Sequence, residues 1–187
     1  YAEFYATSTT QWYSANSATA STTQWNVLGN TGLSATTNFL GTTDAVALRF
    51  RVNDIFSGQI HPDAAVGNTS FGLETNSTTN NNSYTTAFGS YALRANNNSG
   101  VRNSAFGALA LASNNSGLDN TGIGQGALST NLSGDNNTGV GQGALSFNST
   151  GSSNTALGQA ALNSNTTNSN NTAIGKSALF ASTGSNN

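Results

Sequence analysis

A short phrase recurs along the last two thirds of this chain, and its constant spacing limits the possible folds more than any other feature. The phrase reads Asn-Thr-(Gly/Ala)-apolar-Gly-x-x-Ala-Leu and is complete from Asn120 to Leu128. The glycine that follows the apolar residue returns after 17 residues at every step except one of 18, between Gly89 and Gly107. These phrase glycines are Gly72, Gly89, Gly107, Gly124, Gly141, Gly158 and Gly175. A fixed short period predicts a repeat protein whose units pack against one another in sequence order.

The composition of the unit favours a β-solenoid over a helical repeat. A unit of 17 residues is too short for a pair of helices, and its Gly and Asn content is unfavourable in any helix. In a β-solenoid each unit forms one coil, and identical residues stack on one another about 4.8 Å apart. We therefore predict an all-β chain in which residues 68–187 form a seven-coil β-solenoid, or parallel β-roll, with 17-residue repeats.

Two apolar columns are predicted to form the solenoid core, because burying an apolar side chain stabilises a fold by roughly 1.5–3 kcal/mol. One residue of each unit directly precedes the phrase glycine; we call these residues the apolar column, and they are Phe71, Phe88, Phe106, Ile123, Val140, Leu157 and Ile174. Another ends the phrase; these residues, the leucine column, are Leu93, Leu111, Leu128, Leu145, Leu162 and Leu179. The phrase glycines are expected at bends that need positive φ.

A hydroxyl residue lies two places before each member of the apolar column. These residues, the threonine column, are Thr69, Thr86, Ser104, Thr121, Thr138, Thr155 and Thr172. Ice-binding solenoids display Thr columns on a flat outward face, so ice binding is one alternative function. Side chains two residues apart share one face of a strand. Because the apolar column is expected to point inward, the threonine column is expected to do the same, which argues against ice binding.

The phrase from Asn154 to Gly158 and its copies resemble the YadA-like head repeats of trimeric autotransporter adhesins, and similar repeat tracts in phage tail-fibre-like proteins. The resemblance covers residues 68–187. It implies a left-handed parallel β-roll built from a somewhat shorter repeat, association into trimers, and a function in attachment. The binding partner that it implies is a cell-surface glycan or another receptor.

The first third of the chain divides into two segments with other patterns. Residues 1–25 contain a shorter echo, since residues 8–12 return as residues 21–25, and we predict an arm of strands there. Its aromatic residues make it a candidate subunit-contact arm: Tyr1, Phe4, Tyr5 and Trp12. Residues 26–67 are predicted to form a small β-domain, because apolar and polar residues alternate from Val46 to Val52 before an Asn53–Asp54 turn. Pro62 is expected to mark the boundary with the solenoid.

Composition and motifs argue against several classes of function. Only 6% of the residues are charged and the net charge is −2, so no basic patch for nucleic acid is expected. The chain has no Cys, and no apolar run approaches the roughly 20 residues of a membrane helix, so no membrane insertion is expected. The one His lies beside the one Pro without a catalytic pattern. We predict no catalytic residue, no metal and no cofactor.

These observations predict a structural, non-enzymatic subunit of an extracellular or viral fibre that forms homo-oligomers. Two modes of assembly remain open, a trimer around a common axis and a head-to-tail filament. The last unit is complete at Asn187 without a capping element, and an uncovered coil exposes unpaired backbone groups. We therefore expect the arm of a neighbouring subunit, or more of the same fibre, to cover that end, which favours a filament.

Overall fold

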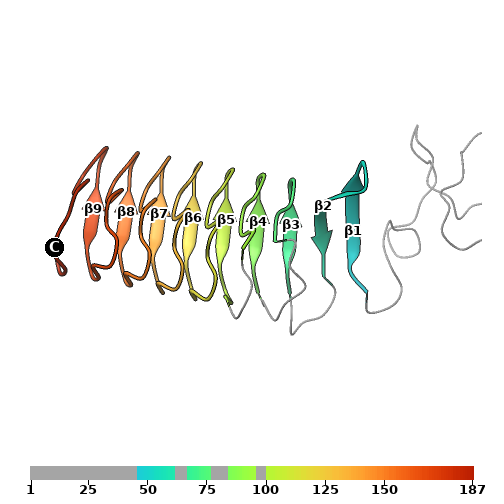
Figure 1. Ribbon diagram of the computed structural model, residues 1–187, viewed down its shortest axis with the longest axis horizontal. Coiled ribbons are helices and arrows are strands. Elements are labelled where there is room, and N and C mark those ends of the chain that lie inside the picture. The colour runs from blue at the N-terminus through green and yellow to red at the C-terminus, as the bar shows by residue number, and fades with distance from the viewer. Residues whose placement is uncertain (1–45, 62–66, 77–83, 96–99) are drawn as a thin grey trace, which may run out of the picture. The chain divides into compact units, whose positions relative to one another are not determined.

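The computed structural model of the protein describes residues 46–61, 67–76, 84–95 and 100–187. These residues form nine strands and no helix, and the strands join into a sheet in chain order, from β1 to β9 (Figure 1). They belong to one compact unit, Asp44–Asn187. The predicted all-β class is confirmed. The arm residues Tyr1, Phe4, Tyr5 and Trp12, and the boundary residue Pro62, lie outside the described residues.

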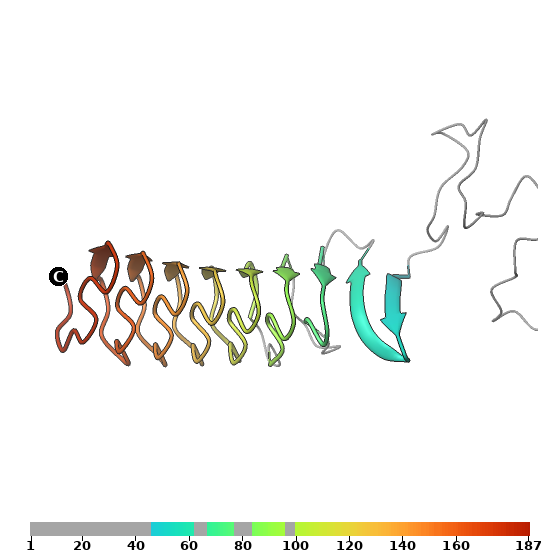
Figure 2. The ribbon, with the colours of Figure 1, turned by 90° about the horizontal axis from the view of Figure 1, so that it is seen from above.

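The last seven strands are parallel and form the wall of a β-solenoid, as predicted. Each has three residues: β3 (Thr69–Phe71), β4 (Thr86–Phe88), β5 (Ser104–Phe106), β6 (Thr121–Ile123), β7 (Thr138–Val140), β8 (Thr155–Leu157) and β9 (Thr172–Ile174). Equivalent residues pair in register, so that Thr121 lies beside Thr138 and Ile123 beside Val140. One coil follows another as a row of similar loops (Figure 2). Each 17-residue repeat is therefore one coil.

A β-hairpin precedes the first coil, at the position where residues 46–52 predict one. Strand β1 (Leu48–Val52) pairs antiparallel with β2 (Ile55–Ile60), and Asn53 and Asp54 join them with φ of +51° and +57°. Two successive positive φ values are typical of the type I′ turn that matches the twist of a two-residue hairpin. Strand β2 also pairs antiparallel with β3. The hairpin thus continues the solenoid sheet and covers the edge of its first coil.

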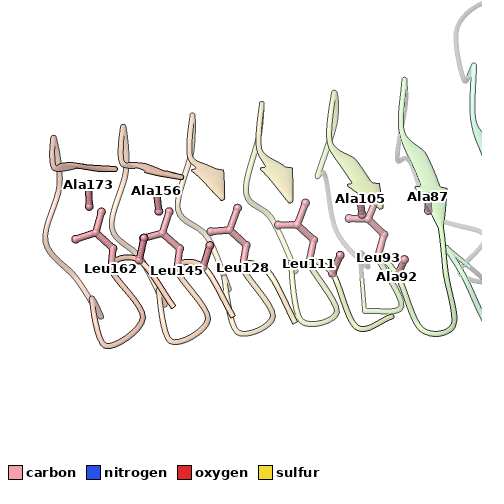
Figure 3. Packing of buried hydrophobic residues seen from close by; sticks show 13 residues of the cluster. Ala87, Ala92, Leu93, Ala105, Leu111, Leu128, Leu145, Ala156, Leu162 and Ala173 are labelled. Carbon is pink, nitrogen blue, oxygen red and sulfur yellow. The ribbon is translucent and has the colours of Figure 1, made fainter. Parts of the chain in front are cut away.

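The interior of the coils is narrow and is filled by leucine and alanine. The leucine column is fully buried from Leu93 to Leu162, whereas Leu179, in the last coil, is 40% exposed. Small residues face these leucines from the centre of each strand, such as Ala87, Ala105 and Ala156 (Figure 3). A Cβ added to Gly122, at the same position in β6, would lie 3.3 Å from Leu111 Cγ. The space opposite each leucine therefore admits only a small side chain.

Two buried asparagine columns, which the hydrophobic pattern of the sequence does not predict, form the rest of the interior. One contains Asn103, Asn120, Asn137, Asn154 and Asn171, and the other Asn114, Asn131, Asn148 and Asn165. The amide of Asn137 donates to the carbonyl of Gly151 (2.8 Å), and its Oδ1 accepts the backbone N–H of Asn154 (3.0 Å). In the second column, Asn131 donates to Asn114 Oδ1 (2.8 Å) and to the Gly134 carbonyl (2.9 Å). These amides satisfy turn backbone that water does not reach.

The phrase glycines lie at sharp bends where successive coils touch. Gly141 has φ of +129°, and a Cβ at this position would lie 2.5 Å from the carbonyl oxygen of Gly158 in the next coil. Real Cβ atoms do not approach backbone so closely. A side chain is therefore excluded both by the conformation and by the neighbouring coil.

The apolar column is not part of the interior, and this corrects the prediction that it belongs to the core. Phe88, Phe106, Ile123, Leu157 and Ile174 are between 38% and 70% exposed, and Phe71 and Val140 are partly exposed. Each three-residue strand turns its central residue inward, so both flanking residues point outward. The interior explains this choice, because the space opposite each leucine holds Ala or Gly and has no room for Ile or Phe.

Candidate assembly face

The outward side of strands β3–β9 presents two parallel columns of side chains. We call this surface the outer face. It consists of the threonine column and the apolar column, both defined above, which share this side because they flank an inward-pointing central residue. None of the residues in these seven strands is charged. The outer face is thus a flat, uncharged strip with one apolar side chain per coil.

Phenylalanine rings form a continuous stack at the hairpin end of the outer face. The ring centroids of Phe71 and Phe88 are 5.5 Å apart, and those of Phe88 and Phe106 are 5.4 Å apart with nearly parallel planes. The row of rings continues onto the hairpin, where the ring centroids of Phe50 and Phe71 are 5.2 Å apart and the ring planes are tilted by 41°. Gly58 lies between these two residues in the sheet. Because it has no side chain, the two rings meet above it.

Leu48 and Ile60 of the hairpin face the same way. Leu48, Ile60 and Thr69 share a position across β1, β2 and β3, so the hairpin extends the outer face with apolar side chains in place of threonine. On the opposite side, Arg49, Gln59 and Ser70 share a position, which places polar groups over the end of the solenoid interior. The apolar set of the hairpin therefore enlarges the exposed strip.

A polar column borders the apolar column beyond the glycine bend. Gln125, Gln142 and Gln159 are exposed and form an amide ladder, with Gln142 donating to Gln125 Oε1 (3.1 Å) and Gln159 donating to Gln142 Oε1 (3.0 Å). We call these three residues the glutamine column. In the threonine column, no side-chain hydrogen bond of Thr121, Thr138 or Thr155 is present among the described residues. Along the chain, Ile123, Val140 and Leu157 are thus each preceded by a threonine and followed, after the bend, by an uncharged amide.

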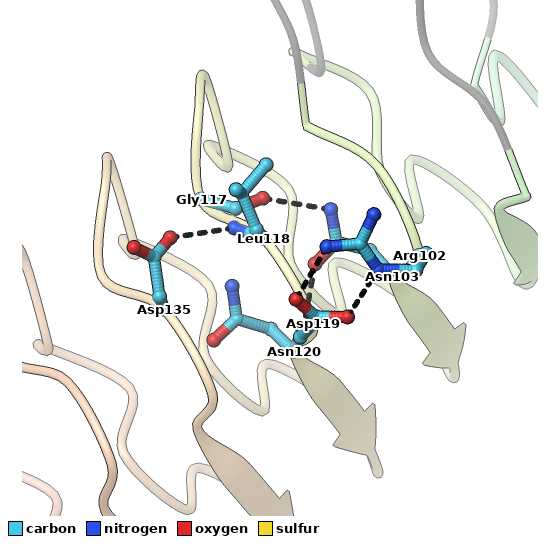
Figure 4. Close-up of polar contacts among 7 residues, drawn as sticks. All are labelled: Arg102, Asn103, Gly117, Leu118, Asp119, Asn120 and Asp135. Carbon is cyan, nitrogen blue, oxygen red and sulfur yellow. Dashed lines mark hydrogen bonds and ion pairs between the residues drawn. The ribbon is translucent and has the colours of Figure 1, made fainter.

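Three charged residues of the coils, Arg102, Asp119 and Asp135, lie outside strands β3–β9, and Lys176 follows the glycine bend of the last coil. Arg102 forms an ion pair with Asp119 of the next coil at 2.6 Å, and Asp135 accepts the backbone N–H of Leu118 at 2.8 Å (Figure 4). The hydrogen bond from Arg102, reinforced by its charge, lowers the pKa of Asp119, and the same contact raises the pKa of Arg102. Both side chains are exposed to solvent, so this pair contributes little to stability.

The described residues do not gather candidate metal ligands. Within them, no three His, Cys, Asp or Glu side chains gather closely enough to hold a metal ion. Likewise, this part of the chain contains no helix that could cross a membrane. The outer face is the feature whose chemistry calls for a partner, because large apolar surfaces in contact with water mark interaction sites.

Comparisons with protein-family models, with curated proteins and with solved structures found no match to this chain. The β-solenoid with its 17-residue repeat is thus established by the structure, and its function must be argued from the outer face.

Proposed function

We propose that this chain is a structural, non-enzymatic segment of an extracellular or viral fibre, in which solenoids associate side by side through the outer face. The observation that carries the proposal is the apolar column, which places one large apolar side chain per coil in contact with solvent. Its burial against a partner would remove this surface from water, and burying such side chains is favourable by roughly 25 cal/mol per Å² of apolar area.

A second copy of the chain is the partner that fits this face best. The apolar column repeats about every 4.8 Å along the solenoid, and a partner must match that period to fill the spaces between successive side chains. Another copy of the chain has the same period because it has the same repeats. The absence of charge from strands β3–β9 also suits a close, dry contact, since charged groups are costly to bury.

Side-by-side association favours a closed oligomer, such as a trimer, over the head-to-tail filament. A head-to-tail contact joins the ends of two solenoids and would leave the outer face in water. Association around an axis parallel to the solenoids covers this face in every subunit, and cyclic symmetry closes the assembly. A trimer with the apolar columns toward its axis is the arrangement that we favour, and the resemblance to adhesin head repeats points the same way.

The described part of the outer face gives less support to binding of a glycan receptor. Sugars stack on the open faces of aromatic rings, but the ring of Phe88 is stacked between those of Phe71 and Phe106. Only the edge of the Phe88 ring remains for a partner. We therefore assign the outer face to assembly, and any attachment function to surfaces elsewhere on the fibre.

Leu157 and Leu132 provide a matched test of this proposal. Both are 47% exposed, but Leu157 belongs to the outer face and Leu132 lies in a linker between strands. Light scattering of the full chain should show an oligomer, which Leu157→Ser should weaken and Leu132→Ser should leave intact. Both variants should keep the β-sheet circular dichroism of the parent. A parent chain that is monomeric at high concentration, or equal weakening by both substitutions, would contradict the proposal.

Ice binding is a second candidate, because the structure removes the argument made against it from the sequence. The threonine column points outward and forms a regular row on a flat face. Ice binding and assembly would use the same surface, since ice can contact the outer face only where no other chain covers it. A monomeric chain that shows thermal hysteresis, and loses it in Thr138→Tyr, would favour ice binding. An oligomer without hysteresis would exclude it.

A further inference from the structure

The second asparagine column coincides with a modification motif. The pattern Asn-x-Ser/Thr, where x is not Pro, is the acceptor sequence for N-linked glycosylation, and such acceptors normally lie on the surface. The first asparagine column lacks this motif, because Gly or Ala lies two places after each of its members. In the second column every member has it, with a hydroxyl residue two places on: Asn114 with Ser116, Asn131 with Ser133, Asn148 with Thr150 and Asn165 with Thr167.

We propose that this chain has two classes of N-glycosylation acceptor with opposite consequences for folding. Asn136 and Asn170 are acceptors that the folded solenoid can carry, whereas a glycan on the second asparagine column excludes the fold. The substrate is an oligosaccharide on a lipid pyrophosphate. Asparagine Nδ2 forms a bond to its anomeric carbon and loses a proton to a base of the transferring enzyme, and the pyrophosphate leaves with the electron pair of the broken bond. This inference is independent of what covers the outer face.

Both amide hydrogens are already in use in the second asparagine column. Nδ2 of Asn148 donates to Oδ1 of Asn131 (2.7 Å) and to the carbonyl of Gly151 (2.8 Å). Asn131 and Asn165 each make the same two kinds of hydrogen bond, and all three side chains are fully buried. A glycosylated amide retains one hydrogen on its nitrogen. A glycan therefore removes one of the two hydrogen bonds and leaves a buried acceptor without a donor.

The space beside these amides does not admit a sugar. A Cβ added to Gly117 would lie 2.7 Å from Nδ2 of Asn131, and one added to Gly151 would lie 3.0 Å from Nδ2 of Asn165. A single methyl group is thus already too large for this part of the interior, and a sugar ring is far larger. Close-packed interiors do not absorb such an insertion. A glycan on this column must hold the coil open.

Two other motifs begin at exposed residues, Asn136 and Asn170. Their φ values are +57° and +59°, in the left-handed region that asparagine tolerates. Within the described residues neither side chain makes a hydrogen bond. Modification of these amides therefore removes no contact, and a glycan on either can extend into solvent.

The two classes become different only when the coils close. The amide of Asn148 bonds to Asn131 in the preceding coil, 17 residues away, and to Gly151 within its own turn. An unfolded chain has neither bond, so its buried and exposed motifs are equally accessible to the transferring enzyme. In a secretory pathway that carries out this modification, glycan transfer and coil closure thus compete for the same amides, and transfer prevents closure.

Site-resolved mass spectrometry of the full chain tests both classes. The chain is expressed with a cleavable secretion signal in eukaryotic cells, and an amidase in heavy-oxygen water converts each glycosylated asparagine into labelled aspartate. The label is mapped in the total product, including chain retained in the cells, and in the fraction that resists a brief digestion with a broad-specificity protease. We expect the total product to be labelled at both classes. The resistant, folded fraction should be labelled at Asn136 and Asn170 but not at Asn131, Asn148 or Asn165.

A control variant removes the motifs of buried acceptors without changing any asparagine. The motifs at Asn68 and Asn76 are included, because these two asparagines are also buried. Two further motifs, at Asn81 and Asn97, lie outside the described residues and remain in both chains. The variant should give several-fold more protease-resistant product than the parent in secretion, and the same amount in bacterial cytoplasm, where this glycan is not added. Its substitutions are Ser70→Ala, Thr78→Ala, Ser116→Ala, Ser133→Ala, Thr150→Ala and Thr167→Ala.

Every outcome supports or overturns the inference. A protease-resistant chain with a glycan at Asn131, Asn148 or Asn165 overturns it, and so does an equal yield of folded parent and variant in secretion. A folded fraction without label at Asn136 and Asn170 overturns the assignment of the exposed class. The occupancy measurement uses the parent alone, so it decides the matter even if the variant misfolds. The oligomeric state enters none of these results, and the proposed function is therefore tested separately.

Discussion

The leucine column and the apolar column look alike in the sequence, yet they have opposite environments. Ile123 and Leu128 belong to the same phrase, but Leu128 is fully buried and Ile123 is 41% exposed. The interior column is Leu at each of its six positions, whereas the outer one contains Phe, Ile, Val and Leu. The interior of a coil has a fixed width and accepts one type of side chain, whereas an outward position accepts several types. Of the two apolar columns of this solenoid, the invariant one is therefore the buried one.

The strongest test of this contrast is a charge in the leucine column. Leu145→Asp places a carboxylate in a fully buried position between the leucines of two neighbouring coils. We expect a loss of about 5 kcal/mol or more in the free energy of unfolding, which would unfold the surrounding coils. Ser149→Asp, in a linker of the same coil, is the control and should unfold close to the parent in denaturant titrations. Equal stability of the two variants would show that the leucine column is not the core.

The asparagine columns make the interior as sensitive to loss of polar groups as to loss of apolar ones. Asn137→Ala removes the acceptor of the Asn154 N–H and the donor to the Gly151 carbonyl. Buried groups left without partners cost about 1–3 kcal/mol each, so we expect a loss of roughly 2–5 kcal/mol. The exposed Ser133→Ala is the control. If thermal unfolding of Asn137→Ala matches that of the control, the amide ladder is dispensable.

Two glycines of neighbouring repeats distinguish the effect of close contact between coils from the effect of backbone strain. At Gly141 a Cβ would collide with the next coil, whereas at Gly126 there is no atom within 4 Å of the added Cβ. Gly126 has φ of +68°, and Ala160 adopts +56° at the equivalent position. We expect Gly141→Ala to cost about 2–3 kcal/mol through overpacking and Gly126→Ala only about 1 kcal/mol through strain. Comparable midpoints in urea would contradict this distinction.

The smallest effect is expected for the ion pair on the coil surface. Because Arg102 lowers the pKa of Asp119, the stabilisation from the ionised carboxylate is present above the unfolded-state pKa of Asp119 and disappears as the pH falls through its folded-state value. Arg102→Gln should lower the melting temperature slightly at neutral pH, and this difference should vanish in acid. A difference that persists after Asp119 is protonated would show that Arg102 acts through its packing.

The sequence by itself determined the repeat, the all-β class, the burial of the leucine column and the hairpin before the first coil. These features depend on local chemistry: a fixed period, alternation of side chains, turn residues such as Asn53 and Asp54, and one Leu per unit. Period-two alternation also showed that the threonine and apolar columns share a side of each strand. It could not show which side, because alternation is symmetrical between inside and outside.

Only the tertiary structure decided that question, through the width of the coil. The chain is short between successive bends, so the space opposite Leu111 or Leu128 accepts Gly or Ala, and the larger Ile123 and Val140 are turned outward. The narrow interior also makes the buried asparagines necessary, since turn carbonyls such as that of Gly134 are not accessible to water. Their 17-residue spacing was visible in the sequence, but asparagine is equally common in solvated turns. Its role becomes clear only when the stacked coils bring one amide against the next.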